Sequence, residues 1–327
     1  MAKPFRVFIP ELFPPALNQR EMLEEIAEVK IGHGEVYREE ELIDEIKDVD
    51  GILMTSKVRI TKNVIDAGKK LKVISKYGVG VDTIDVEYAT KREILVCYTP
   101  GVNSDAVAEH TLGLILATLK KIPQSMAYLR KGGWREEKFL GEELTGATVG
   151  IIGFGNIGLR LAKKLSGFEI KLLVYDPYVS KERIERAGGE KVDLSDLLRN
   201  SNIVSLNLAL TPETFHMIGE KELQQMKPTS YLINTARGPL IDEKALYRAL
   251  IERWIAGAGL DVFEEEPAKP ENPLFSLDNV VVTPHLGGST NKARKRLVIM
   301  AVENLIKVLK GDLPEKENIV NREVLNI

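Results

Sequence analysis

The chain is poor in cysteine and carries little net charge. Its 327 residues include one cysteine, Cys97, which excludes an intramolecular disulfide framework and a cysteine-rich zinc site and suits a reducing compartment. The formal net charge of -3 argues against a dedicated nucleic-acid or polyanion binder. No apolar run reaches transmembrane length, and the strand-like N-terminus is too short for a signal sequence. These absences predict a cytoplasmic protein with no metal site and with neither nucleic acid nor membrane as a partner.

Strand-like and helical patterns alternate along the chain. Apolar, β-branched runs predict strands at 5–9, 51–55, 71–75, 94–98, 149–152, 171–175, 203–208, 231–234, 258–260 and 280–283. Helices are expected between them, including an acid-rich one at 19–30, an apolar one at 104–121 and a long one at 289–310, with 125–145 as a connecting arm. Such alternation predicts an α/β fold with parallel sheets covered on both faces. The length favours two domains.

A G-x-G-x-x-G turn follows the strand at 149–152. Gly153 permits the tight turn, Gly155 lets the backbone approach a pyrophosphate, and Gly158 lets the next helix pack close to the strand. The free N–H groups of that helix would face the phosphates. The next strand ends at Asp176, where an acid meets ribose hydroxyls and repels a 2′-phosphate. The pattern predicts NAD rather than NADP, with S-adenosylmethionine as the alternative ligand.

A second glycine loop, Lys-Tyr-Gly-Val-Gly-Val-Asp at 76–82, lies beyond the strand at 71–75. Ligands of open α/β sheets bind at the carboxyl ends of strands, and successive N–H groups around two glycines can form an anion nest. The spacing alone favours two interpretations equally: a loop that binds a substrate carboxylate, or a plain glycine turn.

Three later strands end in polar residues that carry chemistry. Arg237 follows the strand at 231–234, Asp261 and the acids 264–266 follow the strand at 258–260, and His285 follows the last strand. An arginine fork can hold a carboxylate bidentately. A histidine, with its pKa of roughly 6.5, can exchange the hydroxyl proton, and an acid can hold the imidazole. The set predicts hydride transfer at an oxygen-bearing carbon. The other histidines are interpreted as a loop residue, a packed helix residue and a structural residue: His33, His110 and His216.

With these motifs placed, the chain resembles the D-isomer-specific 2-hydroxyacid dehydrogenases, and most of all their phosphoglycerate dehydrogenase branch. The resemblance spans residues 51–322 and rests on the motifs at 76–82, 153–158, 234–238, 259–267 and 283–290. It implies a doubly wound Rossmann NAD-binding domain, residues 103–290, inserted into a flavodoxin-like substrate domain, residues 1–102 and 291–327. It also implies closure of the substrate domain by the C-terminal helix and a homodimer built through the NAD-binding domain.

The resemblance also implies a role for each matching residue. The catalytic set falls on Arg237, Glu266 and His285, and Asp261 is implied to contact the nicotinamide carboxamide. The residues implied to bind the cofactor are Val79, Gly153, Gly155, Asn156, Ile157, Gly158, Asp176, Leu208, Ala209, Thr214, Thr235, Ala236, Arg237, Asp261, His285, Gly287 and Gly288. The residues implied to bind the small-molecule substrate are Thr55, Ser56, Lys76, Tyr77, Gly78, Val79, Gly80, Asn103 and Arg237.

The expected reaction interconverts a D-2-hydroxy acid and its 2-keto acid. The leading expectation is D-3-phosphoglycerate and 3-phosphohydroxypyruvate, as in serine biosynthesis. The alternatives are a glyoxylate/hydroxypyruvate reductase, another D-2-hydroxyacid dehydrogenase and, more remotely, an NAD(H)-binding corepressor. Thr55 stands where phosphoglycerate enzymes typically place an arginine, with Lys57, Arg59 and Lys76 as candidates to hold a phosphate. Asn207-Leu208-Ala209 replaces the usual His-x-Pro, and regulatory domains have no room.

Overall fold

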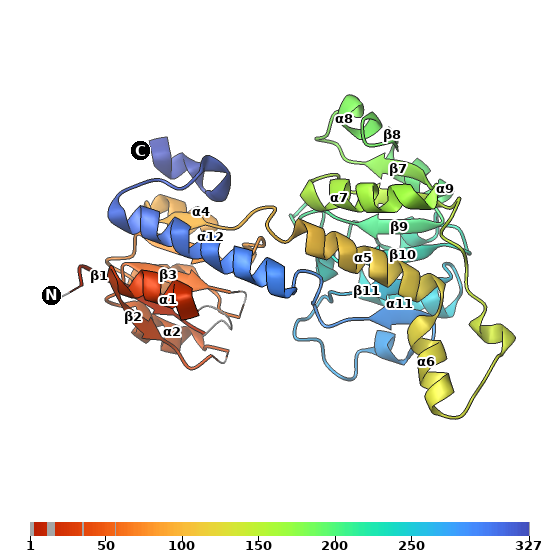
Figure 1. Ribbon diagram of the computed structural model, residues 1–327, viewed down its shortest axis with the longest axis horizontal. Helices are drawn as coiled ribbons and strands as arrows, with labels where there is room; N and C mark the ends of the chain where they lie inside the picture. The colour runs from red at the N-terminus through yellow and green to blue at the C-terminus, as the bar shows by residue number, and fades with distance from the viewer. Residues whose placement is uncertain (1–2, 12–16, 35, 56, 327) are drawn as a thin grey trace. The chain divides into compact units, whose positions relative to one another are not determined.

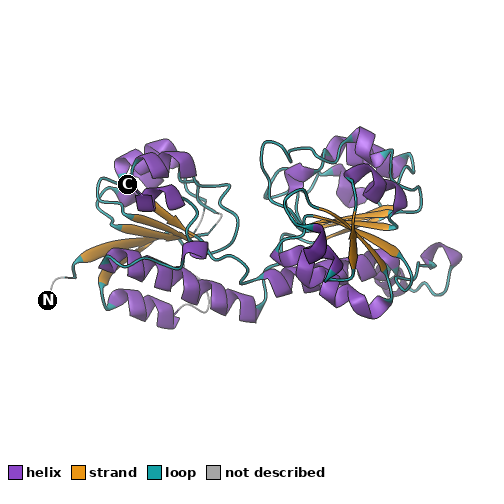
Figure 2. Cartoon of the chain, turned by 90° about the horizontal axis from the view of Figure 1, so that it is seen from above, coloured by secondary structure: helices purple, strands orange, loops and turns teal. Residues whose placement is uncertain are grey.

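The computed structural model describes residues 3–11, 17–34, 36–55 and 57–326. These residues form two compact α/β units (Figure 1). The first unit comprises Met1–Asn103 and Thr290–Ile327, and the second is the continuous segment Ser104–Ser289. In each unit the strands form a central sheet with helices on both faces (Figure 2). None of the described helices combines the length and apolar character needed to span a bilayer.

The described part of the first unit is built on a parallel five-stranded sheet in the order β2-β1-β3-β4-β5. Its strands are β1 (Phe5–Ile9), β2 (Ala27–Ile31), β3 (Gly51–Met54), β4 (Val73–Lys76) and β5 (Leu95–Cys97). Its helices are α1 (Leu17–Glu24), α2 (Glu39–Ile46), α3 (Lys62–Ala67), α4 (Val86–Lys91) and α12 (Asn291–Lys310), followed by the short 3-10 turns Lys316–Asn318 and Arg322–Asn326.

Neighbouring side chains of β1 face opposite layers of this unit. Val7 packs in the cluster that includes Leu23 of α1 and Leu305 of α12, whereas Phe8 packs with residues of α2, α3 and α4. The hydroxyl of Ser75 donates to the carbonyl of Ala301 across 2.7 Å, so α12 is tied to the middle of the sheet. The returning C-terminal helix therefore completes the core of the first unit.

The predicted helix at 19–30 is wrong in its second half. Helix α1 ends at Glu24, and Ala27–Ile31 forms the edge strand β2, which runs parallel to β1 from the pair Phe5 and Ala27 to the pair Ile9 and Ile31. The five residues Ala-Glu-Val-Lys-Ile alternate apolar and charged side chains, the period of a strand with one buried face. The many acids nearby hid that alternation.

The second unit contains a parallel seven-stranded sheet in the order β12-β11-β10-β9-β6-β7-β8 within the described residues. Its strands are β6 (Thr148–Ile152), β7 (Lys171–Tyr175), β8 (Gly189–Lys191), β9 (Ile203–Leu206), β10 (Tyr231–Asn234), β11 (Gly257–Leu260) and β12 (Val280–Val282). Its helices are α5 (Ser104–Leu119), α6 (Ile122–Arg130), α7 (Asn156–Leu165), α8 (Lys181–Glu185), α9 (Leu194–Asn200), α10 (Glu220–Leu223) and α11 (Glu243–Ile251). The remaining elements are short 3-10 helices at Glu137–Phe139, Ser166–Phe168, Gly238–Leu240 and Pro273–Ser276.

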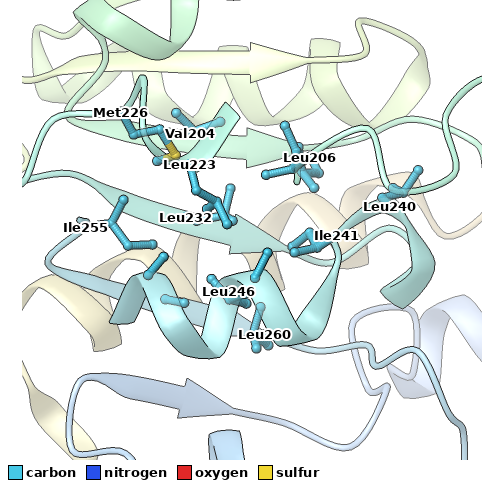
Figure 3. Packing of buried hydrophobic residues seen from close by; sticks show 14 of the residues in the cluster. Val204, Leu206, Leu223, Met226, Leu232, Leu240, Ile241, Leu246, Ile255 and Leu260 are labelled. Carbon is cyan, nitrogen blue, oxygen red and sulfur yellow. The ribbon is translucent and has the colours of Figure 1, made fainter. Parts of the chain in front are cut away.

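Apolar side chains fill both faces of this second sheet. Helices α5 and α7 cover one face through side chains such as Ile115 and Leu161. On the other face, Leu232 of β10 and Leu246 of α11 meet in a cluster from several strands and helices (Figure 3). The cap of α11 is Asp242, whose side chain accepts from the N–H groups of Lys244 and Ala245. Because the inner strands of this sheet are buried on both faces, they are mostly apolar in sequence.

The two strand orders confirm the predicted fold class. In the first sheet β1 lies between β2 and β3, the flavodoxin-like order, and in the second β6 lies between β7 and β9, the Rossmann order. Two elements were not expected: the strand β8, and the helix α6, within which the predicted connecting arm at 125–145 begins. Helix α6 buries none of its residues, and Pro123 in its first turn fits the position just beyond the end of the preceding helix equally well.

Candidate active site

The glycine turn joins β6 to α7 and passes close to the end of β9. Gly153 has a φ of +89°, a conformation that favours glycine, and a Cβ there would lie 2.7 Å from the carbonyl oxygen of Asn207. A Cβ on Gly158 would lie 2.3 Å from the carbonyl oxygen of Gly153, whereas one on Gly155 would meet no atom within 4 Å. The first and third glycines are therefore required by packing, and the second leaves space over the turn.

Asp176 holds the end of β7 against this turn. One carboxylate oxygen accepts from the N–H of Phe154 at 2.7 Å, and the other accepts from Tyr178 at 2.9 Å and Val179 at 3.2 Å. The residue is 9% exposed, so backbone donors on two sides fix the carboxylate. A side chain held in this way presents its remaining lone pairs in a defined direction.

These residues fit a dinucleotide. Helix α7 begins after Gly155, which provides no side-chain cap, so its first N–H groups are open to an anion. The side-chain oxygen of Asn207 is buried beside the turn with no hydrogen-bond partner among the described residues, an acceptor that a bound donor would satisfy. The other residues implied to line the cofactor lie at the start of α7 and beyond the ends of β9, β10 and β12: Asn156, Ile157, Leu208, Ala209, Thr214, Thr235, Ala236, Gly287 and Gly288.

The loops that follow β10, β11 and β12 bring the three predicted catalytic side chains together in the second unit. The Nδ1 atom of His285 lies 2.7 Å from Oε2 of Glu266, whose other oxygen accepts from the N–H of Phe263 at 3.1 Å. Arg237 donates from Nη1 to the carbonyl of Ala236 at 2.7 Å. A carboxylate only accepts, so Nδ1 carries a hydrogen and Nε2 is the ring nitrogen left for a ligand.

The surroundings of His285 raise the pKa of its imidazole above the usual value. The hydrogen bond that Nδ1–H of His285 donates to Glu266 is the largest cause, burial opposes it, and the positive charge of Arg237 also lowers the pKa. The side chain is half exposed, so solvent screens these effects in part. His285 also has a φ of +52°, a conformation sparsely populated by residues with a side chain. It is held there by the bond from its N–H to the carbonyl of Asp261, 2.7 Å.

Sequence spacing alone could not tell which of the three consecutive acids at 264–266 partners His285, and the structure distinguishes them. Glu264 accepts from the N–H of Glu243 and lies 2.7 Å from Nε2 of His216. Glu265 pairs with Lys269 on the surface. Of these acids, Glu266 is the one that bonds His285.

Asp261 organises the loop that carries His285. Its carboxylate accepts from the hydroxyl of Thr283 at 2.6 Å and from the N–H groups of Leu286 and Gly287 at 2.8 Å each. Burial is the largest single influence on the pKa of this carboxyl and raises it, but the hydrogen bonds of the carboxylate together, that with His110 first among them, leave the pKa below its usual value. His110 on α5 bonds Thr283 at 2.9 Å, so it is a partly buried, hydrogen-bonded residue beside the site. Contact of Asp261 with a nicotinamide carboxamide stays a prediction.

The residues predicted to bind substrate lie in the first unit, apart from Arg237. Lys76 ends β4 and is buried, and the loop that follows it contains Tyr77, Gly78, Val79 and Gly80. Gly78 exchanges hydrogen bonds with Thr99, which fixes the backbone of this loop. Burial raises the pKa of the Tyr77 hydroxyl.

The remaining substrate predictions lie at the ends of strands and segments in the same unit. Thr55 follows β3, and Ser56 lies outside the described residues. Asn103 ends the first segment of the unit, with a buried side-chain oxygen that has no hydrogen-bond partner among the described residues. The sequence reasoning missed Glu11, which pairs with Lys57. Its position just beyond a strand end was the available signal.

Comparison with known proteins decides the family. Residues 112–287, within the second unit, match the family model of the NAD-binding domain of D-isomer specific 2-hydroxyacid dehydrogenases. A glyoxylate reductase of Thermofilum pendens is 46% identical over 100% of this chain and 97% of its own length. The chain belongs to the D-isomer-specific 2-hydroxyacid dehydrogenase family. It is thus an NAD-dependent oxidoreductase.

Other members of the 2-hydroxyacid dehydrogenase family extend the comparison. A D-3-phosphoglycerate dehydrogenase of Methanocaldococcus jannaschii is 46% identical over 92% of this chain, but the chain spans only 56% of that relative. The solved structure of D-lactate dehydrogenase from Aquifex aeolicus, complexed with NAD and lactic acid, superposes with a TM-score of 0.87 at 33% identity, covering 96% of this chain and 98% of that one. The family is therefore shared by relatives with different acids as substrates.

Proposed function

We propose that this 2-hydroxyacid dehydrogenase reduces glyoxylate or hydroxypyruvate with NADH. The observation that supports this substrate class is the match with a glyoxylate reductase over nearly the whole of both chains. The phosphoglycerate dehydrogenase relative is much longer, and Thr55 provides no guanidinium for a phosphate. The comparisons thus favour the alternative over the leading expectation of phosphoglycerate oxidation and serine biosynthesis. We assign the second unit to NAD and the first to substrate.

In the proposed reaction His285 is the general acid. Protonated His285 donates its Nε2 proton to the carbonyl oxygen of the keto acid, while its Nδ1–H remains bonded to Glu266. When bound, NADH supplies the hydride that reduces the carbonyl carbon. Glu266 stabilises the imidazolium and fixes the ring orientation. The raised pKa of His285 keeps the donor form present toward neutral pH.

Arg237 is the proposed substrate anchor. Its guanidinium can hold the keto acid carboxylate through parallel N–H donors and polarise the adjacent carbonyl. A positive charge near His285 lowers the pKa of the imidazole, so it favours release of the proton once the substrate is in place. The loop at 76–80 remains our predicted second holder of the carboxylate.

A substrate panel with NADH oxidation as the readout tests this proposal. We expect turnover of glyoxylate and hydroxypyruvate, and a His285→Ala variant should lose at least about 100-fold in kcat, the lower end of the effect of general acid–base groups. NADH affinity should stay within about twofold. Glu266→Gln removes the charged partner of His285 and should also lower kcat, whereas Glu265→Gln, its matched control, should not, because Glu265 pairs with Lys269 instead. Tight NADH binding with no turnover of any keto acid would instead support the corepressor alternative.

We also propose that two copies associate through helix α6 and the segment after it. Ile122, Met126 and Leu129 are exposed on this helix, and their spacing of four and three residues places them on one face. Trp134 and Leu140 are exposed in the following segment. Light scattering during size-exclusion chromatography should give a dimer for the native chain and a monomer for Leu129→Asp. A monomeric native chain would contradict the proposal.

A further inference from the structure

A buried carboxylate lies at the carboxyl edge of the first sheet, at the point where the strand order reverses. Glu11 comes just after β1, and Thr55 and Lys57 come just after β3, its neighbour in the order β2-β1-β3-β4-β5. In doubly wound sheets, the helices that follow two such strands cover opposite faces of the sheet. Ligands of doubly wound sheets bind at this reversal point.

The contacts of Glu11 show how its charge is placed. Oε2 of Glu11 lies 2.7 Å from Nζ of Lys57, and Oε1 accepts from the hydroxyl of Thr55. The Glu11 side chain is only 10% exposed, whereas that of Lys57 is 58% exposed. The carboxylate is therefore the fixed member of the pair, and the ammonium reaches it from solvent. Lys57, a candidate phosphate holder by sequence, is neutralised by this partner.

The field of Glu11 extends to the loop that we expect to hold the substrate carboxylate. The N–H of Tyr77, the first residue after β4, donates to the carbonyl of Met54 at the end of β3. Glu11 is one of the two charges that act on the Tyr77 hydroxyl, and it raises the pKa of that group. Met54 is followed by Thr55, whose hydroxyl donates to Glu11, so an anion bound beside this loop lies near the Glu11 charge.

We propose that Glu11 determines substrate specificity by excluding 2-keto acids that carry an anionic group at C3. The C3 hydroxyl of hydroxypyruvate can donate to the Glu11 carboxylate, and glyoxylate, which has a hydrogen in place of C3, meets no penalty. A phosphate on C3 meets the Glu11 carboxylate and finds the Lys57 ammonium already paired with that carboxylate, so Lys57 is not available to offset the repulsion between like charges. The inference rests on the proposed reduction of 2-keto acids and defines which of them are accepted.

The test is the ratio of kcat/KM for 3-phosphohydroxypyruvate to that for hydroxypyruvate, with NADH saturating. Glu11→Gln should raise this ratio at least about tenfold, because the amide removes the repulsion and releases Lys57. Lys57→Met, a change at an exposed side chain, should lower the ratio, because it leaves the carboxylate unpaired. The two variants thus change the kcat/KM ratio in opposite directions. A loss of stability would instead lower kcat/KM for both substrates together, so the two explanations can be told apart.

Glu28→Gln is the matched control. Glu28 is an exposed residue of β2 that pairs with Arg6, so this variant makes the same charge change near the opposite end of the strands. Its ratio should stay within twofold of the native value. Native enzyme that reduces no keto acid would refute the proposed function itself. Native enzyme that reduces hydroxypyruvate, with a ratio unmoved by Glu11→Gln and Lys57→Met, would overturn the role of Glu11 alone.

Discussion

Replacing Asp176 by asparagine removes one negative charge from the end of β7 and keeps the size of the side chain. The carboxylate is 9% exposed and accepts from the N–H groups of Phe154, Tyr178 and Val179. An amide can still accept through its one oxygen. The variant should therefore fold, with a lower melting temperature because one backbone bond is lost, and its main effect should fall on the choice between NADH and NADPH.

The size of that effect follows from two contributions. A hydrogen bond to a charged acceptor contributes about 1.5–3 kcal/mol, and NADH loses the charge assistance of its ribose bonds when Asp176 becomes neutral. Removing a unit charge about 4 Å from the 2′-phosphate of NADPH relieves about 1 kcal/mol in water and about 4 kcal/mol at an effective dielectric constant near 20. A combined change of about 3 kcal/mol corresponds to a loss of roughly 100-fold in preference for NADH.

Initial rates with saturating glyoxylate, and with NADH or NADPH varied, measure this preference as a ratio of kcat/KM values. Asp193→Asn is the control. Asp193 is the exposed N-cap residue of α9, and its side chain makes no capping hydrogen bond. Its ratio should match that of the native chain. A folded Asp176→Asn variant whose ratio changes less than threefold would refute the assignment of Asp176 to the ribose.

Three further outcomes are expected. Glu266→Gln removes the main cause of the raised pKa of His285. Reduction needs the protonated ring, so activity is lost as pH rises through that pKa, and the alkaline limb of the kcat profile should move to lower pH in this variant. An unmoved limb would show that Glu266 does not set the pKa of His285. In Gly158→Ala, the added Cβ meets the carbonyl of Gly153 at 2.3 Å, so NADH affinity by fluorescence titration should fall at least about tenfold from a strain of about 1–3 kcal/mol; unchanged affinity would contradict this. Leu246→Ala empties a fully buried position and should cost about 2–5 kcal/mol, seen as a lower urea midpoint at unchanged slope, and a native midpoint would refute the packing argument.

The sequence predicted the fold well where strands are buried on both faces. Runs such as 171–175 and 231–234 are apolar except for one polar residue at an end, and they were predicted with the bounds that the structure has. Strand β2 and helix α6 escaped for a shared physical reason: each lies at an edge or surface, where few apolar side chains are needed. Lys30 and Glu28 on β2 pair with Glu45 and Arg6, so the charges that suggested a helix are satisfied across neighbouring elements.

The candidate site also contains residues that the local sequence indicates and residues that depend on the three-dimensional fold. Local chemistry sufficed to select His285, because a histidine between a buried strand and two glycines is an unusual combination. Spacing could not select Glu266 among three consecutive acids, since the choice depends on how the loop after β11 folds back. The structure places the bond to Nδ1 of His285 on Glu266. The family resemblance had indicated the same residue.

Glu11 and Asn207 share a property that explains why neither was predicted to act. Each lies just beyond a strand that borders a reversal of strand order, β1 in the first sheet and β9 in the second. Sheet order depends on long-range pairing, so a local pattern gives no indication of which two strand ends will be neighbours. Once the order is known, the reversal point is known too, and this is where doubly wound sheets bind their ligands. A buried side-chain oxygen lies at the reversal point of each sheet: a carboxylate oxygen of Glu11 in the first and the amide oxygen of Asn207 in the second. Burying such an oxygen is costly unless a hydrogen-bond or charge partner satisfies it. Glu11 and Asn207 are therefore the positions to vary when the substrate and cofactor preferences of this chain are tested.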